Sequence, residues 1–351
     1  MATITNFLQE AVQKKAADIF IISGLPLSFK IGSNIEPHGE MLHPEDTERV
    51  IKEIYVMAER DPERLIQKGD DDFSISVKGL SRFRISAYKQ RGSLAAVIRI
   101  VPFDIPCYKD FNIPEDVMAI SEKTKGMVLV TGPAGGGKST TLACVINRIN
   151  TNSSGHIITL EEPIEYLHRN DKSIISQREV KADTVGYVPA LRAALRQSPD
   201  VILVGEMRDF ETISTAMTAA ETGHLVISTL HSVGAANTVN RIIDVFPSNQ
   251  QQQVRVQISQ LLQSVISQKL IPAVNGGLIP AFEIMHCNNA IRNMIRESKI
   301  HQIDTVINAS ATDGMISMDN SIIRLYKSGL ITRENALAHA ETPELMERRL
   351  K

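Results

Sequence analysis

The chain has 351 residues, enough for two or three domains, and its 43 % hydrophobic and 22 % charged content is ordinary for a globular protein. A formal net charge of -2 excludes a globally basic protein that would attract nucleic acid or an anionic membrane. No apolar run reaches membrane-helix length, no signal peptide is expected, and three scattered cysteines argue against a disulfide framework or zinc site.

Residues 1–101 are predicted to form an α+β domain. Helices are expected near 3–17 and after Pro44, where Glu45 and Asp46 suit the helix dipole. The short apolar stretches DIFII and LSFKI predict strands. Two longer strands, SRFRISAYK and SLAAVIRIV, are joined across QRGS and predict a hairpin.

Three arginines gather on this predicted hairpin. If Gln90 lies opposite Ser93, then Arg84 faces Arg99 directly, and Arg82 shares the face of Arg84. Like charges in that position are destabilising, so we expect an anion between them. One candidate is a triphosphate, bound by this chain or by a neighbouring one, that the arginines would contact as catalytic arginine fingers. The alternative is a solvated basic face or salt bridges within the domain.

The next segment is predicted to connect two domains. Pro102, Pro106 and Pro114 predict an extended linker over residues 102–114. Residues 115–351 then alternate apolar strands with helices, which indicates a parallel α/β sheet. The predicted strands are GMVLVTG, HIITLEE, DVILVGE and HLVISTL.

Helices are predicted to dominate from Asn249 onward. Apolar residues recur at helical spacing over residues 250–270, which predicts one long helix. These residues are Val254, Ile258, Leu261, Leu262, Val265 and Ile266. A group of C-terminal helices is expected over about residues 288–351.

The segment GPAGGGKSTT fits the phosphate-loop pattern G-x-x-x-x-G-K-[ST]. Glycines let backbone amides turn toward phosphate oxygens, and the helix that follows aims its positive end at the anion. Lys138 is expected to reach the β and γ phosphates, and Ser139 to ligate Mg²⁺. The predicted nucleotide-binding residues are Gly132, Pro133, Ala134, Gly135, Gly136, Gly137, Lys138, Ser139 and Thr140.

Carboxylates end two of the predicted neighbouring strands. Glu206 follows VILVG, and we assign it to the metal. Glu161 ends HIITL, and we assign it to polarising the attacking water. Glu162 and Glu165 are equally consistent with solvated turn residues.

Two histidines bracket the strand LVISTL. Ligands of parallel sheets lie outside the carboxyl ends of the strands. His231 at that end is therefore the candidate for γ-phosphate contact or proton relay, whereas His224 is better placed to touch a neighbour or a sheet edge. A purely structural hydrogen-bonding role is the alternative for each.

In this order, the phosphate loop, ITLEEPIEYLH, VILVGEMRD and TGHLVISTLHS resemble the Walker A, Asp, Walker B and His boxes of the secretion and pilus ATPase superfamily. Further segments, among them AIRNMIRESK, resemble its PilT-type twitching-motility branch, over nearly the whole chain. AIRNMIRESK favours retraction over assembly. We expect Arg292 and Arg296 there to serve retraction and not hydrolysis; an apolar core face with solvated charges is the alternative.

The resemblance implies a PAS-like N-terminal domain, a RecA-like motor domain with a helical C-terminal end, and a homo-hexameric ring. It implies Mg²⁺-dependent ATP hydrolysis, with Arg82, Arg84 and Arg99 reaching the γ-phosphate across a subunit boundary. It also implies work at the cytoplasmic face of the inner membrane on a pilus platform protein, either alone or with a partner pilus ATPase, and no nucleic acid.

Some positions depart from the family pattern. The Asp box has Glu162 where Asp is usual, and the phosphate loop has Ala134 and Gly136 where Thr and Ser are commoner. An early Asp-Leu-His becomes Asp18-Ile19-Phe20, which removes the histidine. The remaining alternatives are an assembly or secretion ATPase, an accessory retraction ATPase, a nucleic-acid translocase and a small-molecule kinase.

Overall fold

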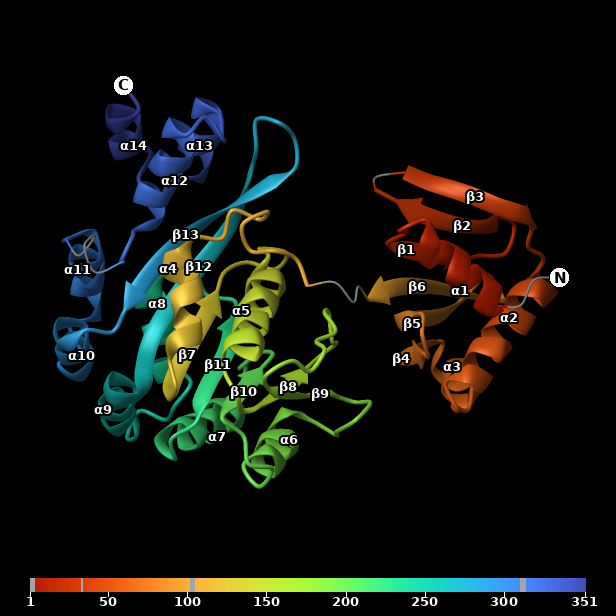
Figure 1. Ribbon diagram of the computed structural model, residues 1–351, viewed down its shortest axis with the longest axis horizontal. Coiled ribbons are helices and arrows are strands. Elements are labelled where there is room, and N and C mark those ends of the chain that lie inside the picture. The colour runs from red at the N-terminus through yellow and green to blue at the C-terminus, as the bar shows by residue number, and fades with distance from the viewer. Residues whose placement is uncertain (1–3, 33, 102–104, 310–313) are drawn as a thin grey trace. The chain divides into compact units, whose positions relative to one another are not determined.

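The chain forms two compact α/β units, each described by itself (Figure 1). The computed structural model describes residues 4–32, 34–101, 105–309 and 314–351. The first unit is Met1–Asp104 with the short segment Glu165–Leu167. The second is Ile105–Ile164 with His168–Lys351. Part of the predicted linker, residues 102–104, and the first residue of the predicted helix 3–17 lie outside the described residues.

The first unit is an antiparallel sheet in the order β3-β2-β1-β6-β5-β4, with its helices packed on one face. Its elements are α1 (Ile4–Gln13), β1 (Asp18–Ile21), β2 (Pro26–Ile31), β3 (Asn34–Met41), α2 (Pro44–Met57), α3 (Glu63–Lys68), β4 (Asp70–Val77), β5 (Ser81–Gln90) and β6 (Ser93–Val101). The predicted strands of this unit are confirmed, while β3 and β4 were not predicted.

The predicted hairpin register is confirmed. Gln90 pairs with Ser93, and Arg84 lies opposite Arg99. Phe83 and Ile85 point to the other face and are fully buried in the core. The alternation of apolar and charged residues thus fixes which side of β5 meets the helices and which side carries arginine.

The second unit is built on a sheet in the order β13-β12-β7-β11-β10-β8-β9, in which only the β12–β13 pair is antiparallel. Up to β11 its elements are α4 (Glu115–Met118), a 3₁₀ turn (Ala119–Glu122), β7 (Gly126–Thr131), α5 (Lys138–Asn152), β8 (His156–Glu161), β9 (Ile174–Glu179), α6 (Tyr187–Ala194), β10 (Val201–Val204), α7 (Phe210–Glu221) and β11 (Leu225–Leu230). The predicted parallel sheet is confirmed.

The rest of this unit completes the sheet and adds helices. The elements are α8 (Ala235–Asp244), α9 (Gln251–Leu261), β12 (Leu262–Pro272), β13 (Leu278–His286), α10 (Asn289–Arg296), a 3₁₀ turn (Ile300–Gln302), α11 (Ile303–Ala309), α12 (Met318–Lys327), α13 (Arg333–His339) and α14 (Pro343–Arg349). Within the described residues, the prediction of C-terminal helices over about 288–351 is confirmed.

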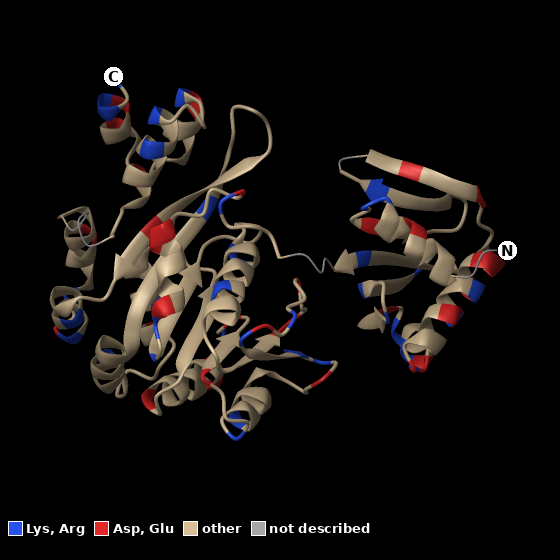
Figure 2. Ribbon diagram, viewed as in Figure 1, with Lys and Arg blue, Asp and Glu red and all other residues tan. Residues whose placement is uncertain are grey.

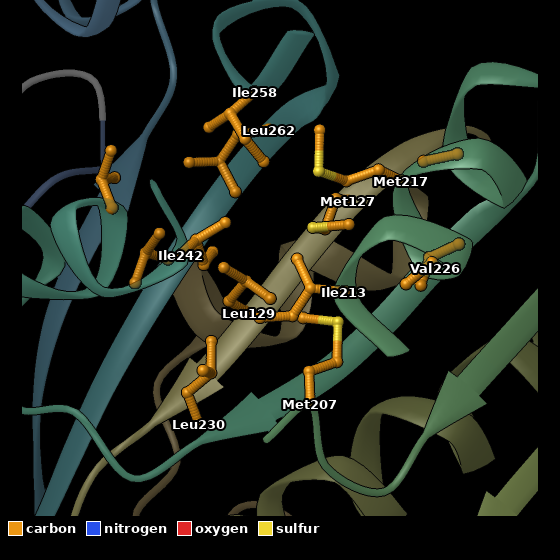
Figure 3. Close-up of a cluster of buried hydrophobic side chains, with 14 of the residues drawn as sticks. Met127, Leu129, Met207, Ile213, Met217, Val226, Leu230, Ile242, Ile258 and Leu262 are labelled. Carbon is orange, nitrogen blue, oxygen red and sulfur yellow. The ribbon is translucent and has the colours of Figure 1, made fainter. Parts of the chain in front are cut away.

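Two hydrophobic cores sandwich the sheet. Helices α4 and α5 pack on one face, and α6 to α11 supply the apolar side chains of the other. Figure 3 shows the second of these cores, where Met127 and Leu129 from β7 meet Ile213 and Met217 from α7. A third core joins α12, α13 and α14 to the end of β12 and the start of β13.

The prediction of one helix over 250–270 is wrong. Helix α9 ends at Leu261, and the chain continues as β12 between β7 and β13. Most of β12 is buried, and its apolar residues Leu262, Val265 and Ile266 continue the helical spacing of α9, so periodicity does not distinguish this strand from a longer helix. Ile258 and Leu262, from the helix and the strand, lie together in one core (Figure 3).

The two long strands β12 and β13 also correct the expectation that helices dominate from Asn249.

Figure 2 shows Lys and Arg interspersed with Asp and Glu along the elements of each unit. Among the described residues, no helix has both the length and the apolarity that a membrane span requires.

Candidate nucleotide-binding site

The phosphate loop lies at the carboxyl edge of the second unit's sheet. It leaves β7 at Thr131 and enters α5 at Lys138. The amide of Gly132 donates to Leu230 O, at the end of the neighbouring strand β11, over 3.3 Å. Because β7, β11, β10 and β8 are parallel, the residues that follow all four strands meet at this edge.

Gln268 on β12 packs against the phosphate loop. A Cβ on Gly132, whose φ is +139°, would lie 2.0 Å from the carbonyl oxygen of Gln268. A Cβ on Gly137, whose φ is +81°, would lie 2.8 Å from Gln268 Nε2. Both positions therefore require glycine for conformation, and Gly132 also requires it for space, because the atom it would meet belongs to the backbone. Gln268 is 2 % exposed, and its Oε1 accepts from Thr141 Oγ1 over 2.7 Å.

The loop presents a cationic, amide-rich end of a long helix. Lys138 Nζ donates to Gly132 O over 3.0 Å and to Pro133 O over 2.8 Å, which holds the ammonium over its own loop. The 15-residue helix α5 starts at this lysine, so the positive N-terminal end of its dipole faces the same place. This arrangement suits a polyphosphate.

Glu206 and His231 come together beside the loop. Glu206 follows β10, where Thr229 Oγ1 donates to Gly205 O over 2.6 Å and ties the two strand ends together. Its Oε2 lies 2.7 Å from Arg208 Nε and 3.5 Å from His231 Nε2. The Glu206 side chain is only 16 % exposed. A cavity of about 480 Å³ opens here, lined by both residues of this pair and by Arg241.

The carboxylate at the end of β8 is held in place from two sides. Glu161 Oε1 accepts from Thr159 Oγ1 over 2.7 Å and from Gln177 Nε2 over 3.1 Å. The next residue, Glu162, instead forms an ion pair with Lys181. The sheet thus brings Glu161 and Glu206 to the same edge, whereas Glu162 is occupied by a surface contact.

Tyr187, at the start of α6, is a site residue that the sequence did not reveal. Its hydroxyl would lie 3.0 Å from a Cβ on Gly205, immediately before Glu206. Burial raises the pKa of the Tyr187 phenol, and the nearby charges of Glu206, Glu162 and Glu161 raise it further. The phenol therefore stays neutral and is a hydrogen-bond donor among carboxylates.

His224 lies at the opposite edge of the sheet. It precedes β11, and its carbonyl accepts from Gly126 N at the start of β7. Its Nδ1 lies 2.9 Å from Ala219 O and 3.1 Å from Thr222 Oγ1, at the end of α7. Within one chain, His224 is therefore not part of the site that contains His231.

An anion beside the hairpin arginines is present within the first unit itself, as the carboxylate of Asp18. Asp18, 5 % exposed, accepts from Arg99 Nε over 2.8 Å, and Lys30 Nζ lies 3.9 Å away. Arg82 Nη1 donates to Ser76 Oγ over 3.2 Å. In the part of the chain that the structure describes, Arg84 has no ion-pair partner. The intradomain alternative therefore holds for Arg99, and Arg84 is the arginine most available to an external anion.

The two arginines of AIRNMIRESK differ in their contacts. Arg292 Nη1 donates to Ser259 O over 2.7 Å and to Gln260 O over 2.9 Å, so it caps the C-terminus of α9. Arg296 donates to Asn293 within its own helix and is exposed. Ile291 and Ile295 are fully buried core residues, as the structural alternative proposed.

The donor types at the sheet edge fit a magnesium ion. A hydroxyl from Ser139 and a carboxylate from Glu206 are oxygen ligands, and Mg²⁺ usually takes few protein ligands besides phosphate and water. A phosphate loop followed by a helix, with acids and a histidine after adjacent parallel strands, defines the chain as a P-loop nucleoside triphosphatase.

Comparisons with known proteins place the chain in one family. The model of the family "Type II/IV secretion system protein" matches residues 1–320. The chain is 42 % identical over 342 residues to the type IV pilus retraction ATPase PilT of Pseudomonas aeruginosa, covering 97 % of this chain and 99 % of that protein. It is 45 % identical over 318 residues to a twitching motility protein of Neisseria gonorrhoeae, covering 89 % and 85 %.

A solved structure of the pilus retraction motor PilT with bound ADP superposes with a TM-score of 0.91 at 44 % identity, covering 99 % of this chain and 100 % of that one. The chain therefore belongs to the Type II/IV secretion system protein family and is an ATPase. The predicted resemblance to the PilT-type retraction branch is confirmed.

Proposed function

We propose that this ATPase is the motor that powers type IV pilus retraction, and with it twitching motility. The proposal rests on the carboxyl edge of the second unit's sheet, where the phosphate loop, Glu206 and His231 lie side by side; we call it the catalytic edge. The chain that carries this edge is similar to retraction motors over nearly its whole length. The first unit is then a PAS-like domain and the second a RecA-like motor domain.

The proposed chemistry assigns one task to each group. Lys138 and the loop amides bind the β and γ phosphates of ATP. Ser139 and Glu206 would hold Mg²⁺, which supplies charge neutralisation on the phosphates when it is bound. Glu161 orients and polarises the attacking water, and Thr159 and Gln177 fix the direction of its carboxylate. His231 contacts the γ-phosphate or relays the proton.

We further propose that the site is completed in trans within a homo-hexamer. Arg84, which has no ion-pair partner among the described residues, would reach the γ-phosphate of a neighbouring chain, with Arg82 and Arg99 beside it. The motor would act at the cytoplasmic face of the inner membrane on a pilus platform protein, alone or with a partner pilus ATPase.

Mixing two inactive variants tests completion in trans. Lys138→Ala disables the phosphate loop, and Arg84→Ala disables the proposed finger. If each site combines two chains, random mixing of equal amounts restores about a quarter of the sites, because those sites receive both intact parts. A self-contained site predicts no recovery. Lys78→Ala, which removes an exposed cation in the β4–β5 turn of the same unit, is the matched control and should stay active.

Retraction itself is tested in a piliated bacterium that lacks its own retraction ATPase. Expression of this chain should restore twitching, and the Lys138→Ala variant should not. Accumulation of surface pili despite ATPase activity of the purified chain would oppose a retraction role and favour an assembly motor. Recovery only in the presence of a partner ATPase would favour the accessory role.

A further inference from the structure

Two buried side chains hold the start of α8, immediately after His231. Ser267 Oγ accepts from Gly234 N over 3.0 Å, and Glu283 Oε1 accepts from Ala235 N over 2.6 Å. Ser267 and Glu283 are directly paired across β12 and β13. The sheet thus holds two successive amides of the turn that carries His231.

The same carboxylate also reaches the C-terminal helices. The backbone amide of Met318, the first residue of α12, faces Glu283 and lowers the pKa of its carboxyl. One side chain therefore accepts from the first turn of α8, beside the catalytic edge, and faces the first turn of α12 in the C-terminal group. The 10-residue helix α8 directs the positive end of its dipole toward this acid.

Burial of the Glu283 carboxyl carries a desolvation cost in free energy. Glu283 is 4 % exposed, and burial raises the pKa of its carboxyl to about 7. An apolar residue of similar volume would avoid that desolvation cost, as with other buried charges. The Glu283 carboxylate instead accepts from the first turn of α8 and faces the first turn of α12, so its position connects these two helix starts.

The turn itself has few other restraints. Thr238 Oγ1 donates to Gly234 O over 2.7 Å, and Ser232 Oγ lies 2.8 Å from the same hydroxyl. These bonds close the turn on itself, whereas Ser267 and Glu283 connect it to the sheet. His231, half-exposed, approaches Glu206 from the other end of this turn.

We propose that Glu283, assisted by Ser267, is a positioning residue that orients His231 for ATP hydrolysis by holding the first turn of α8 against the sheet. This inference rests on the catalytic role of His231 proposed above. It makes Glu283 a link through which a displacement of α12 would reach the catalytic edge, since the same carboxylate faces the first turns of both helices.

The test compares Glu283→Leu, which removes the acceptor, with Glu283→Gln, whose amide oxygen still accepts from Ala235. For the Leu variant we expect kcat to fall about tenfold or more while KM for ATP changes less than about twofold, because ATP is bound by other groups. The Gln variant should retain at least about half of the original kcat. Glu341→Gln, which lines the same 310 Å³ cavity as Glu283 but has no bond to α8, is the matched control and should remain unchanged.

A double-mutant cycle separates positioning from general damage. In a His231→Ala background, Glu283→Leu should lower kcat by less than about twofold, since nothing remains to be positioned. An equal loss in both backgrounds, or full activity of the single Leu variant, would overturn the inference. If His231→Ala alone leaves kcat intact, the proposed role of His231 fails first. Ser267→Ala gives the weaker form of the same test should the Leu variant not fold.

Discussion

At the scale of single residues, the contact between Gln268 and the phosphate loop makes a direct prediction. Gln268→Ala removes the bond to Thr141 and the side chain beneath Gly137. We expect the Kd for ATP, measured by titration with a fluorescent analogue, to rise about tenfold, because the loop loses the support that orients its amides.

Thr141→Val tests whether that hydrogen bond carries the effect. The two variants should be non-additive, with a coupling energy of about 1 kcal/mol in ATP binding, since each removes the same bond. Purely additive losses would mean that Gln268 acts by filling space alone.

The hairpin arginines differ in their ion-pair partners, so they are predicted to differ in their effects on stability and hydrolysis. Arg84→Ala should leave the free energy of unfolding within about 0.5 kcal/mol of the original, because no described residue pairs with it and Arg99 repels it. Hydrolysis should fall at least about a hundredfold if Arg84 is an arginine finger. Arg99→Ala should instead cost about 1 kcal/mol of stability, because it removes the closest cation from buried Asp18.

These residues also show where sequence reasoning stopped. The positions of the phosphate loop, Glu206 and His231 at one sheet edge were predictable, because each follows an apolar run that forms a parallel strand. Gln268 and Glu283 are distant in sequence from the residues they hold, and no local pattern marks them. Tyr187 likewise enters the site only through the fold of the segment before α6.

At the scale of elements, the two arginines of α10 are predicted to differ in their effect on stability. Arg292→Ala removes two charge-assisted bonds to the last carbonyls of α9, and should lower the free energy of unfolding by about 1–2 kcal/mol. Arg296→Ala, on the exposed face of the same helix, should change it by less than about 0.5 kcal/mol. Denaturant titration of both variants distinguishes them.

Both α10 variants should retain ATPase activity, because α10 contributes no residue to the sheet edge that carries the phosphate loop. A collapse of hydrolysis in Arg296→Ala would contradict this, since that side chain is exposed and donates a hydrogen bond to Asn293 of its own helix. Loss of twitching by Arg296→Ala with intact hydrolysis and stability would assign the exposed face of α10 to a partner.

The junction of α9 and β12 explains the largest error of the sequence analysis. Val265 and Ile266 continue the apolar spacing of α9, yet both are fully buried within β12. Helical periodicity was present, but pairing with β7 and β13 decides the conformation. That override depends in part on β7, which lies more than a hundred residues earlier in the chain, so a local window does not contain it.

At the scale of the whole molecule, strand and helix alternation was enough to predict a parallel sheet, but not its order. The central positions of β7 and β11 follow from crossovers that local patterns do not encode. The order nevertheless assembles the candidate site, because it sets His231 next to the phosphate loop and brings Gln268 against that loop. The position of Glu283 between two helix starts is a second consequence of this order.

Several charges act on the Glu283 carboxyl from the elements packed around it. Burial raises its pKa most, and Glu341 and Asp304 raise it further. The amides of Ala235 and Met318 act in the opposite direction. The balance leaves the pKa at about 7, against an ordinary value of 4.5. The folded protein therefore binds this proton more tightly than the unfolded chain does.

It follows that protonated Glu283 stabilises the fold fully below about pH 4.5, and that this contribution is lost as the pH rises through 7. Glu283→Gln cannot titrate, so its advantage in free energy of unfolding over the original chain should grow by up to about 3 kcal/mol across that range. Denaturant titrations at several pH values measure the difference, with exposed Glu40→Gln as the control. A difference that stays flat with pH would mean that Glu283 ionises freely, and that neither helix start depends on a buried, costly acceptor.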